Sequence, residues 1–200
     1  GPHTLYEWDS SMPSGNPLTS IINSFYTLTV INYAILRMHQ HIPSDVRVMA
    51  YGDDHIISFK SSDLAHQDFV HTFGQMGYEY TDEGKTNVVA ASRPLSQVSF
   101  LKRGFSLAVV GGDQTWLPPL ELNVILTMGQ WVDKNAPADF YDAIHETALR
   151  ELSLHEEGVW AKWCPKIVSV FKPHLTRDVS FPIDQEVIRH LVICGPTTST

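Results

Sequence analysis

The sequence contains few cysteines and no long apolar run. Its 200 residues include only two cysteines, Cys164 and Cys194. They lack C-x-x-C spacing and are too few for a secreted disulfide scaffold, so we expect two buried free thiols. The ten histidines form no Cys/His cluster at zinc-ligand spacing. Because we find neither a membrane-length apolar stretch nor a basic-then-apolar signal at the start, we expect a soluble intracellular chain without a transmembrane segment.

Positive charge is scarce as well. Fourteen Lys and Arg stand against 22 Asp and Glu, and the net charge of −8 argues, as an average, against a nucleic-acid partner. The distribution is uneven, because residues 85–103 and 162–177 each hold four basic residues and no acid. Residues 133–157 instead collect seven acids, which is typical of a solvated helix face. The two basic segments either line a phosphate backbone or are ordinary surface.

The hydrophobic content of 43% is enough to bury a sizeable core, in one large domain or two small ones. A turn-rich segment at 11–20 leads into an expected long helix, in which apolar residues recur near the 3.6-residue period. That pattern predicts an inward face of Ile21, Ile22, Phe25, Leu28, Ile31 and Ile35.

The segment VMAYGDDHIISF (48–59) has two apolar, strand-like runs joined by Gly-Asp, which predicts a tight β-hairpin. Asp53 and Asp54 are ordinary turn residues on one interpretation. Two adjacent carboxylates repel each other, however, and a cation between them and a ligand explains the pair better. Their hard oxygen atoms suit Mg²⁺ or Mn²⁺.

The rest of the chain predicts an α+β layer followed by helices. After the hairpin we expect a helix capped by Ser61 or Ser62, short strands at 78–80 and 87–90, and a hairpin through 98–110. The helix after the hairpin should end at Gly77 and bury Ala65, Phe69, Phe73 and Met76. Beyond a domain boundary near 104–112, the residue pattern predicts helices.

Within this second part, prolines mark the expected helix boundaries. Helices should begin near Pro119 and near Pro137 with Asp139, and Pro165 should break or kink a later helix. The expected core residues of this part are Tyr141, Ile144, Ala148, Leu152, Trp160 and Trp163.

Two polar residues of the long helix, Thr19 and Asn23, lie four residues apart and so project from one face. They are ordinary polar surface on the simplest interpretation. Just before them, Ser14 and Gly15 offer backbone N–H groups near a helix N-terminus, where phosphate or an RNA backbone is readily bound.

The order of these features resembles a known family. Ser14-Gly15, then Thr19 and Asn23, then YGDD, then Lys85 and finally FLKR at 100–103 follow the order and spacing of four motifs of RNA-dependent RNA polymerases from picornavirus-like positive-strand RNA viruses. The wording PSGNPLT looks closest to dicistroviruses and iflaviruses. The resemblance implies a partial right-hand polymerase, with an α+β palm at 1–103 followed by a mostly helical thumb at 104–200.

The resemblance also implies roles for individual residues. Asp53 would bind the two catalytic Mg²⁺ ions with support from Asp54, and Lys85 would protonate pyrophosphate. Ser14 and Gly15 would contact the template and the incoming nucleotide. Thr19 and Asn23 would contact the ribose 2′-hydroxyl, and Lys102 and Arg103 would contact the primer strand. Lys85 could instead be the solvated end of a turn, and Lys102 and Arg103 a plain charged strand end.

One required residue is not found. The family needs another aspartate on a preceding palm strand, and Glu7 and Asp9 have the wrong context for it. We therefore expect the C-terminal part of a longer polymerase from a viral polyprotein, inactive without the missing fingers and N-terminal palm. Its expected partners are RNA template and primer and nucleoside triphosphates, at replication complexes in the host cytoplasm.

Two other interpretations remain open. A reverse transcriptase carries a similar Y-x-D-D hairpin, although the pair Thr19 and Asn23 argues against it. The chain could also be a non-catalytic remnant of an integrated viral polymerase that binds only RNA or protein.

Overall fold

The computed structural model describes residues 17–60, 64–82, 92–130, 135–137, 139–178 and 183–195. The chain divides into two compact units, Gly1–Ser92 and Arg93–Thr200. This division falls before the FLKR segment, earlier than the boundary expected after residue 103, because Arg103 pairs with Leu120 in an isolated β-bridge. The assignment of palm and thumb to residue ranges stays a prediction.

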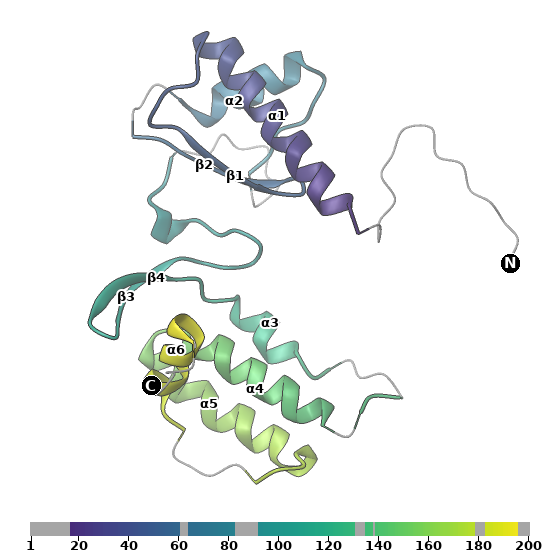
Figure 1. Cartoon of the computed structure of the whole chain (residues 1–200), viewed down its shortest axis with the longest axis vertical. Helices are drawn as coiled ribbons and strands as arrows, with labels where there is room; N and C mark the ends of the chain where they lie inside the picture. The colour runs from purple at the N-terminus through teal and green to yellow at the C-terminus, as the bar shows by residue number, and fades with distance from the viewer. Residues whose placement is uncertain are drawn as a thin grey trace, which may run out of the picture. The chain divides into compact units, whose positions relative to one another are not determined.

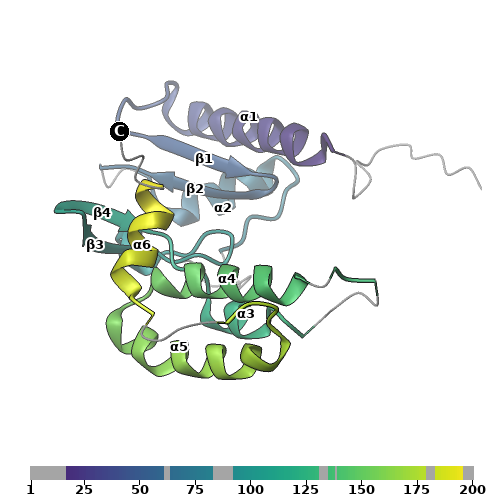
Figure 2. The same ribbon diagram turned by 60° about the horizontal axis from the view of Figure 1, so that its bottom comes forward.

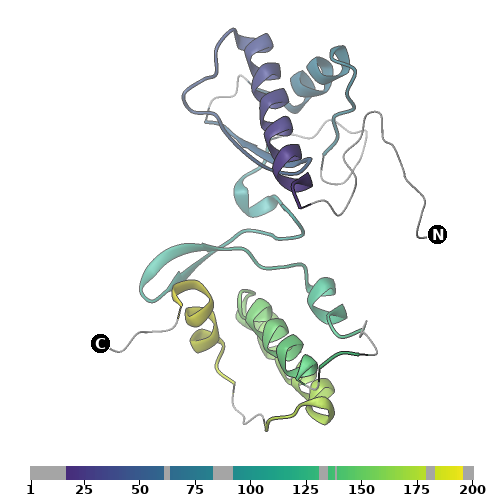
Figure 3. The same ribbon diagram turned by 45° about the vertical axis from the view of Figure 1, so that its right-hand side comes forward.

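The described part of the N-terminal unit is a helix pair packed on one face of a β-hairpin. It consists of α1 (Thr19–His39), β1 (Arg47–Tyr51), β2 (Asp54–Ser58) and α2 (His66–Gln75). Figures 1 and 3 show α1 crossing the hairpin with α2 beside it. The core between these layers contains Ile31, Ala34, Ile35, Val46, Leu64, Phe69 and Phe73, with Val48 and Ile57 of the hairpin packed against it.

Helix α1 is buried only toward its C-terminal end. Ile31 and Ile35 are fully buried, as expected, but Ile21, Ile22 and Phe25 are 54%, 42% and 69% exposed. The expected inward face is therefore wrong for the first turns of the helix. The hairpin strands and α2 pack against the later turns, so no layer among the described residues covers these apolar side chains.

The YGDD hairpin forms as predicted. Strands β1 and β2 pair antiparallel from Arg47↔Ser58 to Tyr51↔Asp54, which leaves Gly52 and Asp53 as a two-residue turn. Gly52 has φ +64°, a conformation that glycine adopts without a steric penalty and that tight hairpin turns require.

Helix α2 differs from its prediction at its start, and the segment after the helix differs as well. The helix begins at His66, where the backbone N–H of Ala65 donates to the Asp68 carboxylate (3.0 Å). Ser61 and Ser62 lie outside the described residues. Residues 78–80 form no strand, because the ring of Tyr80 packs against Phe69 and Phe73 and no described strand lies beside this segment to pair with it. The strand expected at 87–90 also lies outside the described residues.

The C-terminal unit combines a second hairpin with helices. Its regular elements are η1 (Leu95–Gln97), β3 (Ser106–Val110), β4 (Asp113–Leu117), α3 (Leu122–Thr127), α4 (Phe140–Ser153), α5 (Glu157–Phe171), η2 (Lys172–His174) and α6 (Gln185–Cys194). Figure 2 shows α4 and α5 side by side. These two helices, together with α3 and the residue Leu120, form a core of Leu120, Ile125, Ala148, Leu149, Leu152, Trp160, Cys164, Ile167 and Val168.

Several expectations for this unit need correction. The hairpin expected within 98–110 pairs only at Phe100 and Arg103, and the ladder instead joins β3 to β4. Of the two effects expected at Pro165, the helix break is wrong, because α5 continues through the exposed proline with core residues on both sides of it, and the kink stays a prediction. Cys164 is buried as expected, but Cys194 is exposed.

The inward face of α4 also differs. Ala148 and Leu152 are buried as expected, whereas Tyr141 and Ile144 are only partly buried. Asp142 and His145 are buried in this helix, so the acidic segment is not a purely solvated face. Across the described ranges, no helix is both long and apolar enough to cross a membrane.

Candidate functional site

Asp53 and Asp54 lie at the tip of the β1–β2 hairpin, and both side chains are exposed. Exposed, adjacent carboxylates are the oxygen donors that Mg²⁺ and Mn²⁺ prefer. Among the described residues, no group of three or more His, Cys, Asp or Glu side chains could hold a metal. The pair therefore fits part of a divalent-ion site, and further ligands have to come from elsewhere.

Side chains of helix α1 bind both main-chain polar groups of Gly52 in this turn. The backbone N–H of Gly52 donates to Ser24 Oγ at 2.8 Å, and Thr27 Oγ1 donates to the Gly52 carbonyl at 2.7 Å. The Ser24 hydroxyl in turn donates to the carbonyl of Ser20 at 2.6 Å. These contacts fix the residue directly before Asp53 without involving either carboxylate.

His55 supports the other side of the turn. Its Nδ1 lies 3.1 Å from the carbonyl oxygen of Asp53 and its Nε2 lies 2.8 Å from the hydroxyl of Tyr80. Burial lowers the pKa of His55, which favours the neutral ring, and burial raises the pKa of Tyr80. A neutral ring that donates from Nδ1 to the carbonyl and accepts at Nε2 from Tyr80 satisfies both contacts.

The nucleotide-contact residues expected on α1 are placed on that same helix. Thr19 and Asn23 are half-buried and one turn apart, and Asn23 directly precedes Ser24. Ser14, Gly15 and Lys85 lie outside the described residues, so their roles stay predictions.

Lys102 and Arg103 lie in the C-terminal unit and differ from each other. Leu101 and Lys102 form a tight turn with φ +53° and +61°, and the Lys102 side chain is exposed. Arg103 is bound within its own unit, because its guanidinium donates to both carboxylate oxygens of Glu151 (2.8 and 2.9 Å) and to the Pro118 carbonyl (3.0 Å). The hydrogen bonds that Arg103 donates to the Glu151 carboxylate raise the pKa of Arg103. A primer contact remains a prediction for both residues.

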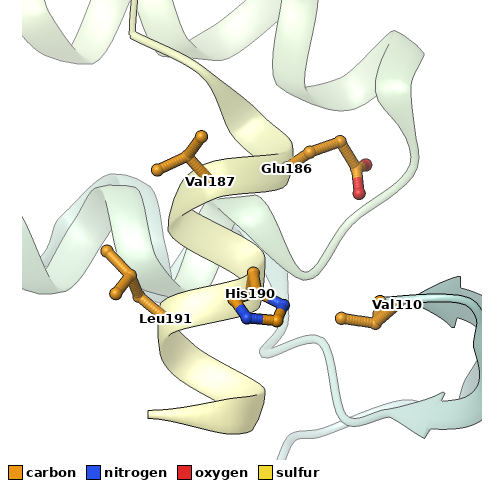
Figure 4. Close-up of a pocket in the computed structure, with 6 residues that line it drawn as sticks. Val110, Glu186, Val187, His190 and Leu191 are labelled. Carbon is orange, nitrogen blue, oxygen red and sulfur yellow. The ribbon is translucent and has the colours of Figure 1, made fainter. Parts of the chain in front are cut away.

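A small pocket of about 370 Å³ lies in the C-terminal unit between the β3–β4 turn and α6 (Figure 4). It is lined by Val110, Gly111, Glu186, Val187, His190 and Leu191. None of the described residues predicted to contact metal, nucleotide or RNA lines it.

Sequence reasoning missed the residues that support the turn. Ser24, Thr27 and His55 each hold a backbone group of Gly52 or Asp53. One signal was present, because Ser20, Ser24 and Thr27 follow a helical stripe of hydroxyl residues at spacings of four and three. Nothing in the sequence placed that stripe against the hairpin.

The structure contains a hairpin with YGDD at its tip, anchored to a helix that carries Thr19 and Asn23. This is the arrangement expected for a viral RNA-dependent RNA polymerase. The family model described as viral RNA-dependent RNA polymerase matches residues 2–172, and the chain belongs to this family. The predicted resemblance is thereby confirmed.

Among individual proteins, the chain is similar to replicase polyproteins of insect viruses. It is 28% identical to that of Drosophila C virus over 183 residues (84% of this chain) and 30% identical to that of acute bee paralysis virus over 186 residues (83% of this chain). It is also 31% identical to the genome polyprotein of a human hepatitis A virus over 141 residues, 66% of this chain.

The fold is shared with a solved polymerase. The Sicinivirus 3Dpol RNA-dependent RNA polymerase matches with a TM-score of 0.59 at 17% identity over 86% of this chain, which confirms the predicted fold class of a partial polymerase. The match covers 36% of that solved chain, and the insect-virus matches cover 10% of each polyprotein. This chain therefore spans only part of each relative.

Proposed function

We propose that this chain is the C-terminal part of a polymerase that extends an RNA 3′-hydroxyl with nucleoside triphosphates on an RNA template. The observation that carries the proposal is the pair of exposed carboxylates, Asp53 and Asp54, at the tip of a hairpin anchored to α1. Membership of the viral RNA-dependent RNA polymerase family supports it.

In the proposed reaction, the primer 3′-hydroxyl loses its proton to water as its oxygen bonds to the α-phosphorus of the nucleotide. The bond from that phosphorus to the oxygen bridging the α- and β-phosphates breaks, and pyrophosphate leaves. Two divalent ions held by Asp53 with support from Asp54 would activate the 3′-hydroxyl and neutralise charge on the phosphates. The protein's own contribution is to position the reacting groups and to exclude wrong geometries.

Other residues would orient the nucleotide and the RNA. The Asn23 amide both donates and accepts hydrogen bonds, so it can recognise a ribose 2′-hydroxyl together with Thr19. Ser14 and Gly15 would contact template and nucleotide, and Lys85 would give a proton to the departing pyrophosphate. Lys102 is the exposed cation for the primer backbone, and Arg103 would support the turn that presents it.

The chain matches only 36% of the solved polymerase, and the carboxylates among the described residues do not by themselves complete a metal site. We therefore expect that residues 1–200 alone do not polymerise. The test is template-directed incorporation with primer and Mg²⁺, measured for the full-length parent protein and for this 200-residue chain. We expect incorporation by the parent only.

The outcomes separate the alternatives. Incorporation by the 200-residue chain would contradict the incomplete-site argument. A parent that prefers deoxynucleotides would be a reverse transcriptase, and a parent that binds RNA without incorporating any nucleotide would be a non-catalytic remnant.

A further inference from the structure

Two hydroxyl side chains of α1 satisfy both polar groups of the Gly52 backbone. Ser24 Oγ accepts from the N–H at 2.8 Å, and Thr27 Oγ1 donates to the carbonyl at 2.7 Å. A turn residue outside the hairpin ladder usually leaves these groups to water. Here one short stretch of helix fixes them both.

The directions of the hydrogen bonds are consistent along the helix. The Ser24 hydroxyl gives its only proton to the Ser20 carbonyl at 2.6 Å, which leaves its lone pairs to accept from Gly52. Thr27 gives its proton directly to the Gly52 carbonyl. Removing either oxygen would leave one backbone group of the turn without this partner.

The spacing connects two parts of the proposed site. Asn23 is the residue before Ser24, and Asp53 is the residue after Gly52, so the hydrogen bond between Gly52 and Ser24 joins the covalent neighbours of two site residues. A shift of the hairpin tip along α1 would change the separation between the Asn23 amide and the Asp53 carboxylate.

We propose that Ser24 and Thr27 are positioning residues that hold the carboxylate turn in fixed register with the ribose-contact face of α1. The proposal deepens the proposed function and rests on it, because the register matters only if Asn23 and Asp53 act on the same nucleotide. A misplacement of about 1 Å can reduce the rate of a positioned reaction by around 10²-fold.

The key variant is Thr27→Val in the full-length parent protein, because valine keeps the β-branched shape and lacks the hydroxyl. We expect kcat for the matched nucleotide to fall by about 10-fold or more, with a smaller change in KM, because the loss lies in orientation rather than ground-state binding. The preference for ribonucleotides over deoxyribonucleotides should fall in the same variant.

Two other variants serve as controls. Thr27→Ser retains the hydroxyl and should restore most of the rate. Thr29→Val is the matched control on the same helix, because the exposed Thr29 Oγ1 donates to the Phe25 carbonyl of its own helix (2.7 Å) and, among the described residues, makes no hydrogen bond to the hairpin. We expect this variant to leave kcat unchanged.

A readout that does not depend on activity comes from amide hydrogen exchange. Ser24→Ala in the parent protein should raise the exchange rate of the peptide containing Gly52, whereas Thr29→Val should not. This measurement needs no metal, nucleotide or RNA.

The outcomes distinguish the inference from the function on which it rests. If the unmodified parent does not polymerise but Ser24→Ala still raises exchange at Gly52, the proposed function fails and the anchoring contact stands. If the parent polymerises and Thr27→Val matches Thr29→Val in kcat, the positioning role is overturned. Equal losses for Thr27→Val and Thr27→Ser would also overturn it, because the hydroxyl would then be irrelevant.

Discussion

The β1–β2 turn of the N-terminal unit and the contacts of α4 in the C-terminal unit use polar side chains in different ways. Around the β1–β2 turn, neutral hydroxyls and an imidazole hold the main chain, and the carboxylates of Asp53 and Asp54 stay exposed. In the C-terminal unit, the charged side chains of Arg189 and Asp142 bind main-chain groups directly. The comparison teaches that a charged residue is a candidate for function when other groups hold its backbone and leave its charge accessible.

Arg189 shows the second pattern most fully. It is 8% exposed, and its guanidinium donates to the carbonyls of Ser153 (2.8 Å) and His155 (2.7 Å) and to the Glu186 carboxylate (2.6 Å). These contacts join α6 to the end of α4. Asp142 behaves similarly, because its carboxylate accepts from the backbone and hydroxyl of Thr176, and these hydrogen bonds lower its pKa.

The largest expected effect is at Asp53. Asp53→Asn in the full-length parent should remove polymerase activity while leaving folding intact or slightly improved, because it removes charge repulsion beside Asp54. The matched control is Asp113→Asn, at the exposed tip of the other hairpin, which should keep its rate. Retention of more than about a tenth of the wild-type rate, under 1.4 kcal/mol of barrier, would contradict the ligand assignment.

The next effect separates Arg103 from its neighbour. Arg103→Met should lower the free energy of unfolding by about 1–2 kcal/mol, because it leaves Glu151 and the Pro118 carbonyl without their donor. Lys102→Met, at an exposed position, should stay within about 0.5 kcal/mol. Chemical denaturation of the two variants measures this difference.

RNA affinity gives a second test of the difference between Lys102 and Arg103. Lys102→Met in the full-length protein should weaken RNA binding and reduce its salt dependence. If Arg103→Met instead weakens RNA binding and leaves stability unchanged, Arg103 belongs with the accessible charges.

A smaller effect is expected at Asn23. One neutral hydrogen bond is worth about 0.5–1.5 kcal/mol, so Asn23→Ala should reduce discrimination against deoxynucleotides by roughly two- to tenfold. The measurement is kcat/KM for matched NTP and dNTP pairs in the parent protein. An unchanged ratio would make Asn23 an ordinary polar residue of the helix face.

The smallest expected effect is the pH dependence at His145, which is 3% exposed and whose Nε2 has no hydrogen-bond partner among the described residues. Burial, together with the nearby charge of Arg177, lowers its pKa. Above about pH 6.5, the usual imidazole pKa, His145 is neutral in both states and its contribution to stability is complete. Below that pH, the unfolded chain takes up a proton that the folded chain does not, so the free energy of unfolding falls.

His145→Gln removes this part of the pH dependence. Denaturation of the chain and the variant at about pH 7.5 and about pH 5.5 gives the comparison, since the two values bracket the imidazole pKa. An identical loss of stability in both proteins would show that His145 does not titrate as its burial implies.

Much of the N-terminal unit could be predicted because its signals are local. The YGDD turn needs only a glycine at a positive φ between two apolar runs, and α1 needs only its periodicity. The strand expected at 78–80 was wrong because strands depend on a neighbour, and the aromatic contacts of Tyr80 with Phe69 and Phe73 decided its place.

The supporting contacts of the site could not be predicted in the same way. The hydrogen bonds that Ser24 and Thr27 share with Gly52 join residues 28 and 25 positions apart in the sequence, so they depend on how the helix packs. The exposure of Phe25 and the ion pair of Arg103 with Glu151 are likewise set by which surfaces meet. Residue type alone carries no such information.

Main-chain anchoring determines which positions of the site can drift during evolution. On the hairpin, the hydrogen bonds of Ser24 and Thr27 go to the peptide groups of Gly52, so exchanges of the exposed neighbouring side chain of Tyr51 leave both hydrogen bonds in place. We expect positions 24 and 27 to accept only small side chains with an oxygen on the β-carbon. Position 52 should remain glycine because of its positive φ and not because of crowding, since a Cβ there would meet no atom within 4 Å. Related chains should therefore vary less at positions 24 and 27 than at position 51, the aromatic residue of the YGDD motif.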